Sequence, residues 1–105
     1  MLPERPSPEV TARRFRILAE RWQAATGHLS SITQAAMHPA YQQIIGMGPD
    51  VVGLLLEELT RQPDHWFWAL QSITGENPVP PPDQGTVPKM AAAWLAWGRQ
   101  HGYRI

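Results

Sequence analysis

Apolar residues near the N-terminus recur at the three- and four-residue spacing of an amphipathic α-helix. Ser7 followed by Pro8 is typical of a helix start, and Gly27 predicts that the helix ends in a left-handed glycine. Because charged residues separate the apolar ones, we expect this helix to dock by a single face. That face consists of Phe15, Leu18, Trp22 and Ala25.

Serine, proline and glycine residues divide the rest of the chain into further helices. Ser30 and Ser31 can cap the next helix, and Asp64 is placed to cap a later one. Gly75 and Gly102 are expected to end the last two helices. These helices cover residues 32–45 with a break at Pro39, 49–60, 65–74 and 87–100. No stretch alternates apolar and polar residues long enough for a half-buried strand, so the pattern predicts an all-α fold of about five helices.

Residues 76–86 contain four prolines and a glycine, so neither a helix nor a central strand is expected to pass through them. Residues 78–81 fit a P-x-x-P frame, which leaves two interpretations, a rigid connector or a polyproline ligand. Pro3 and Pro6 predict an extended tail over residues 1–6. The rest, 7–105, is predicted to be a single helical domain.

The helix over residues 49–60 carries a wide apolar stripe and is expected to be the most buried helix, paired with the helix over residues 65–74. The last helix should close the exposed end of this pair. The side chains predicted to be deeply buried together are Leu55, Leu59, Trp66, Leu70, Ile73 and Trp94.

Charge and composition narrow the possible partners. The 105 residues carry nine basic and nine acidic side chains, and this balance argues against nucleic acid as the main ligand. There is no cysteine, no apolar run of membrane-spanning length and no apolar leader, so we expect a cytoplasmic protein that does not contact a membrane. One basic cluster keeps a nucleic-acid role open as an alternative: Arg5, Arg13, Arg14, Arg16 and Arg21.

No residue set has the spacing of a catalytic or metal site. The four histidines, His28, His38, His65 and His101, include no pair three or four residues apart. His38 and His65 lie at predicted helix starts, where capping or packing is expected of them. Ser30 and Ser31 lack a nucleophile elbow, and Glu57 and Glu58 point about 100° apart on a helix. We therefore predict no catalysis, no metal and no cofactor. A third hypothesis, an enzyme or small-ligand binder, needs a concave pocket with converging polar groups, and a cavity lined by His38, Tyr41 and His65 would favour it.

Three consecutive aromatic residues, Trp66, Phe67 and Trp68, exceed what one helical face can bury. Trp66 shares a face with Leu70, whereas Trp68 points about 200° away. Either a second layer containing Trp22 covers Trp68, or Trp68 lies in a surface that binds a partner. The candidate partner-binding residues are Trp68, Arg14 on the charged side of the first helix, and Tyr103 after the terminal glycine.

Residues 44–75 resemble one HEAT-like helical repeat, in which a glycine-proline turn at 46–49 leads into two antiparallel helices. The whole chain also resembles a family of small uncharacterised bacterial helical proteins. That resemblance depends on four stretches, residues 26–31, 38–48, 63–70 and 73–80, with Ala25 departing from the glutamate that precedes the first in the family. It implies kinship and no particular activity.

These observations predict a non-catalytic protein–protein interaction module. By analogy, its setting would be that of an antitoxin, immunity protein or adaptor in a bacterial conflict or mobile locus. The alternative is a nucleic-acid-associated accessory protein that uses the N-terminal arginine helix. The identity of the protein partner does not follow from the sequence.

Overall fold

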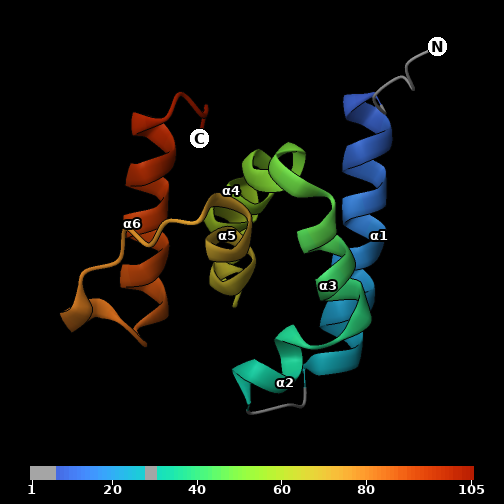
Figure 1. Ribbon diagram of the computed structural model, residues 1–105, viewed down its shortest axis with the longest axis horizontal. Helices are drawn as coiled ribbons and strands as arrows, with labels where there is room; N and C mark the ends of the chain where they lie inside the picture. Colours follow the sequence, from blue (N-terminus) through green and yellow to red (C-terminus); the bar gives the residue numbers. More distant parts are fainter. Residues whose placement is uncertain (1–6, 28–30) are drawn as a thin grey trace.

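The computed structural model describes residues 7–27 and 31–105, which contain six α-helices, two 3-10 helices and no strand. The all-α prediction is therefore confirmed, and the predicted tail over residues 1–6 lies outside the described part. The elements, shown in Figure 1, are α1 (Pro8–Thr26), α2 (Ile32–Ala36), α3 (Pro39–Gly46), η1 (Gly48–Val51), α4 (Val52–Arg61), α5 (Phe67–Thr74), η2 (Pro81–Asp83) and α6 (Val87–Gln100).

Several predicted helix boundaries are confirmed by their caps. The Ser7 hydroxyl accepts a hydrogen bond from the Val10 amide at 3.2 Å, and Ser31 caps α2 at the same distance through the Gln34 amide. Ser30, the other predicted cap, lies outside the described residues. Gly75 ends α5 with a φ of 74°, a left-handed conformation that glycine adopts without steric cost.

Two predicted caps are wrong. Gly27 has a right-handed φ of −59°, because its amide still bonds the Gln23 carbonyl at 3.1 Å and continues the helical ladder. Asp64 bonds the amide of the adjacent His65 at 2.7 Å and does not cap α5, which begins only at Phe67. The 3-10 helix η2 gives the proline-rich loop one short helical turn, where its prolines predicted no helix.

The helices form a flattened body with principal extents of 49 × 33 × 23 Å. α1 and α6 stand at opposite edges, and α3, α4 and α5 lie between them (Figure 1). α1 packs mainly against α3, α4 against α6, and α5 against α3. Contacts between α4 and α5 are fewer, so the HEAT-like pairing of these two helices stays a prediction.

A cluster of four aromatic rings joins α1, α3 and the residue that precedes α5. Trp66 is at its centre, with ring centroids 4.5 Å from Trp22, 5.7 Å from Tyr41 and 5.9 Å from Phe15. All four side chains are buried. Large buried rings contribute much of the stability of a small domain, and such contacts add to the area they remove from water.

The Tyr41 hydroxyl, at the edge of this cluster, caps the N-terminus of α5 in place of Asp64. It donates a hydrogen bond to the His65 carbonyl and accepts one from the Ala69 amide, both at 2.9 Å. Ala69 lies in the first turn of α5, where backbone amides have no partner within the helix. A residue 28 positions earlier in the chain therefore fixes where α5 begins.

The predicted core is confirmed at five of its six positions. Leu55, Leu59, Trp66, Leu70 and Trp94 are buried in one cluster. Ile73, in the last turn of α5, is only partly buried and packs on the edge of that cluster.

Leu55→Ala should lower the free energy of unfolding by about 2–5 kcal/mol, because the side chain is completely buried and its removal leaves a cavity. Urea denaturation measures the loss. Glu57→Ala, at an exposed position of the same helix, should change stability by less than about 0.5 kcal/mol. Equal losses for the two variants would mean that α4 is placed with the wrong face inward.

Tyr41→Phe should lower the free energy of unfolding by about 1–3 kcal/mol, because it keeps the ring but removes the partner of the buried Ala69 amide and of the partly buried His65 carbonyl. Burial also raises the pKa of the Tyr41 phenol well above its usual range. An unfolded tyrosine ionises near pH ~10, so above that pH unfolding releases this proton and rising pH favours the unfolded chain. Part of the alkaline loss of stability should therefore disappear in Tyr41→Phe, measured by urea denaturation between about pH 8 and 11. The same alkaline slope in both proteins would contradict the burial of the phenol.

Candidate interaction surface

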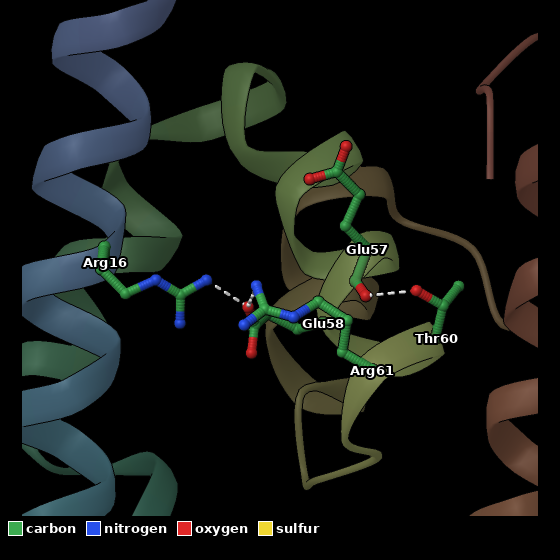
Figure 2. A network of polar contacts seen from close by, with 5 residues as sticks. All are labelled: Arg16, Glu57, Glu58, Thr60 and Arg61. Atoms are coloured by element: carbon green, nitrogen blue, oxygen red, sulfur yellow. Dashed lines mark hydrogen bonds and ion pairs between the residues drawn. The ribbon is translucent and has the colours of Figure 1, made fainter.

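One arginine of the N-terminal cluster has an internal partner. Glu58 on α4 is only 5% exposed, and its carboxylate accepts hydrogen bonds from Arg16 on α1 and, at 3.4 Å, from Arg61 (Figure 2). The hydrogen bond to Glu58 raises the pKa of the Arg16 guanidinium. Figure 2 also shows the neighbouring Glu57 carboxylate directed away from Glu58, as its helical position predicts. Arg16 therefore serves the α1–α4 contact.

The opposite side of α1 is exposed. Val10 and Ile17 are 49% and 50% exposed, which is high for large aliphatic side chains. Exposed Arg14 and Arg21 lie beside them, since residues four and seven apart share a helical face. We call these four residues, Val10, Arg14, Ile17 and Arg21, the outer stripe of α1.

A small pocket adjoins the N-terminal half of this stripe. It has a volume of about 200 Å³ and lies between α1 and the α3–η1 junction. This volume is below the 300–1,000 Å³ typical of small-molecule sites and suits a single inserted side chain. Its lining residues are Val10, Thr11, Arg14, Met47 and Asp50.

The three predicted partner-binding residues lie on α1, on α5 and in the segment that follows α6. Arg14 is exposed on α1 and lines the pocket. Trp68 on α5 is 39% exposed. Trp22, which was the candidate to cover it, contacts the ring of Trp66. Tyr103 is partly buried, with its ring 5.9 Å from that of Trp97. Tyr103 therefore also helps to hold the C-terminal residues against α6.

Val10 and Ile17 were not singled out from the sequence. Their signal was present, because two aliphatic residues seven positions apart lie off the apolar face predicted for the first helix. What the sequence could not show is that no other described element covers that side of α1.

The pocket beside His65 does not bring together the three residues of the small-ligand site considered above. His38 caps α3 through its Nδ1 atom, which accepts from the Ala40 amide at 3.1 Å. His65 lines a pocket of about 240 Å³ with Trp22 and Asp64, and neither His38 nor Tyr41 lines that pocket. Over residues 7–27 and 31–105, no three histidine or acidic side chains are grouped so that they could hold a metal ion. None of the described helices has the length and apolarity to cross a membrane.

The proline-rich loop packs on α6 as expected for a connector. Val79 is buried, and the Trp97 indole donates a hydrogen bond to the Glu76 carboxylate at 3.0 Å. A groove of about 550 Å³ runs between the loop and α6. An ion pair between Lys89 and Asp83 at 3.9 Å lies along it, and its lining is otherwise mostly proline, alanine and Trp97.

No protein-family model matches the chain, and no curated protein or solved structure is significantly similar to it. The resemblances to a HEAT-like repeat and to small bacterial helical proteins receive no support from these comparisons and stay predictions. Function must therefore be inferred from the surfaces of the chain itself.

Arg16→Met should lower the free energy of unfolding by about 1–3 kcal/mol, because it leaves the buried Glu58 carboxylate with only the more distant Arg61. The double variant Arg16→Met/Glu58→Met should be more stable than Arg16→Met, since no buried charge remains. Arg13→Met, on the exposed side of the same helix, is the control and should have an effect below about 0.5 kcal/mol. Thermal melts in which Arg16→Met behaves like this control would contradict the role of the ion pair.

Proposed function

We propose that the protein is a non-catalytic protein-interaction module that binds its partner through the outer stripe of α1. The observation that carries the proposal is the position of half-exposed Val10 and Ile17 beside Arg14 and Arg21 on one face of one helix. Arginine is enriched at protein interfaces, and the fully buried core of an interface is more apolar than the rest of the protein surface.

The energetics favour a covered state for this face. Complete burial of a valine or isoleucine contributes about 1.5–3 kcal/mol, so covering the exposed half of each contributes about 1 kcal/mol. The two arginines add directional hydrogen bonds to carboxylates or carbonyls of a partner. The α1 backbone is already held by the aromatic cluster and by the Arg16–Glu58 pair. The face is thus pre-organised and loses little backbone entropy on binding.

Binding to nucleic acid is the alternative, and the surface favours it less. Arg16, one of its five candidate arginines, is paired with Glu58, and Arg5 lies outside the described residues. The aliphatic side chains along the middle of the face gain nothing from a phosphate backbone, which binds by charge. The proposed antitoxin, immunity or adaptor setting depends on analogy alone and stays a prediction.

The test begins with co-purification of the full chain from its native cell and identification of the protein that accompanies it. Calorimetric titration should then show that Ile17→Ala and Arg14→Ala each weaken binding by more than about 1 kcal/mol. Both positions are exposed, so the thermal midpoints should stay within about 2 °C of the parent.

Two controls locate the surface. Glu57→Ala changes an exposed residue of α4 and should leave affinity unchanged. Trp68→Ala examines the rival site on α5. Loss of binding in Trp68→Ala with parental affinity in both α1 variants would move the interaction surface from α1 to α5 and overturn the proposal.

A further inference from the structure

We infer that the outer stripe of α1 binds an amphipathic α-helix of another protein, acidic along one flank, that inserts one apolar side chain into the pocket beside α1. This inference rests on the proposed function and adds the shape and charge of the partner. Three features of the described residues carry it: the spacing of the apolar positions, the placement of the arginines and the lining of the pocket.

The apolar positions of the face repeat every seven residues. Val10 is followed by Ile17 and then by exposed Ala24, so these side chains are spaced by about 10.5 Å along the helix axis. A seven-residue repeat forms a nearly straight line along an α-helix, and a second helix lying beside it can match every position. An extended peptide, with side chains about 6.6 Å apart on one face, would not keep this register.

The arginines lie on one side of that line. Arg14 and Arg21 are also seven residues apart, and each follows an apolar position by four residues, as the flanking charged positions of a helix pair do. Exposed Glu9 and Glu20, with Arg13, lie on the other side. The flank of a partner helix that faces Arg14 and Arg21 must therefore carry aspartate or glutamate to be complementary.

The pocket accepts a different kind of side chain. Val10 and Met47 give it an apolar surface, and its volume of about 200 Å³ suits one residue. An aliphatic anchor in the pocket, next to an acidic residue that reaches Arg14, satisfies both the apolar lining and the charges.

A second copy of this chain, with its α1 antiparallel, is one competing helix. In an antiparallel pair related by a two-fold axis, the same edge of each α1 would meet its own copy. The arginine edge would then face another arginine edge, which costs free energy. An acidic partner helix avoids this repulsion.

The test uses two designed helical peptides of about three heptads, labelled with a fluorophore. Both carry leucine along one face. The acidic peptide has glutamate on both flanks, and the basic peptide has lysine at the same positions. Fluorescence anisotropy with the full chain should show at least tenfold tighter binding of the acidic peptide at low salt, with the difference falling as salt is added.

Charge reversal then tests the assigned residues. Arg14→Glu/Arg21→Glu should invert the preference, so that the basic peptide binds at least tenfold tighter than the acidic one. Arg99→Glu/Arg104→Glu makes the same change in net charge at exposed positions near the C-terminus and should keep the parental preference. Replacing the leucines of the acidic peptide by alanine, one at a time, should reveal one position whose loss weakens binding most, as expected for the pocket anchor.

The outcomes separate this inference from the proposed function. Equal binding of the two peptides, or no binding of either, would overturn the acidic-helix inference. Titration of Ile17→Ala with the native partner would still test whether the outer stripe of α1 is the interaction surface. Duplex DNA that binds more tightly than the acidic peptide and displaces it would overturn the inference in favour of nucleic acid. Dimerisation of the full chain that Ile17→Glu abolishes, seen by sedimentation, would identify a second copy as the occupant.

Discussion

The Tyr41 hydroxyl and the rings around it are the contact on which the rest of this fold depends. Its two hydrogen bonds reach the His65 carbonyl and the Ala69 amide, so one side chain of α3 sets both the approach to α5 and its first turn. Trp66, held between Tyr41 and the α1 rings, then ties the same point to α1. Because a backbone group that loses its hydrogen-bond partner on burial is costly, these two hydrogen bonds favour this placement of α5.

The contacts that hold the buried face of α1 in place determine which of its side chains are exposed to solvent. One face of the helix is used by the aromatic cluster, and Arg16 at its border is used by the Glu58 carboxylate. The remaining face carries Val10 and Ile17 beside two arginines, with no described element over it. Two arginines of the same cluster thus differ in their surroundings: Arg16 is paired with the buried Glu58 carboxylate, and Arg14 is exposed.

The candidate site could be predicted only in part. Arg14 was identified from its place on the charged side of the first helix, and the structure adds the pocket that it lines. Trp68 is exposed, but Tyr103 packs on Trp97 and is partly covered. Val10 and Ile17 could not be predicted as site residues, because single aliphatic residues off the main apolar face are common on protein surfaces and do not by themselves indicate a binding site. Whether they indicate a binding site depends on whether another part of the chain covers them.

The sequence by itself determined the all-α class, the approximate extent of the helices and most of the core, because helical periodicity and local caps such as Ser7 act within a few residues. Only the tertiary structure decided which helices pair, why Asp64 does not start α5 and which arginine turns inward. Those outcomes depend on contacts between residues far apart in the chain, 28 positions for Tyr41 and Ala69 and 42 for Arg16 and Glu58. No local pattern records such contacts, since their free energy exists only once the chain has brought the partners together.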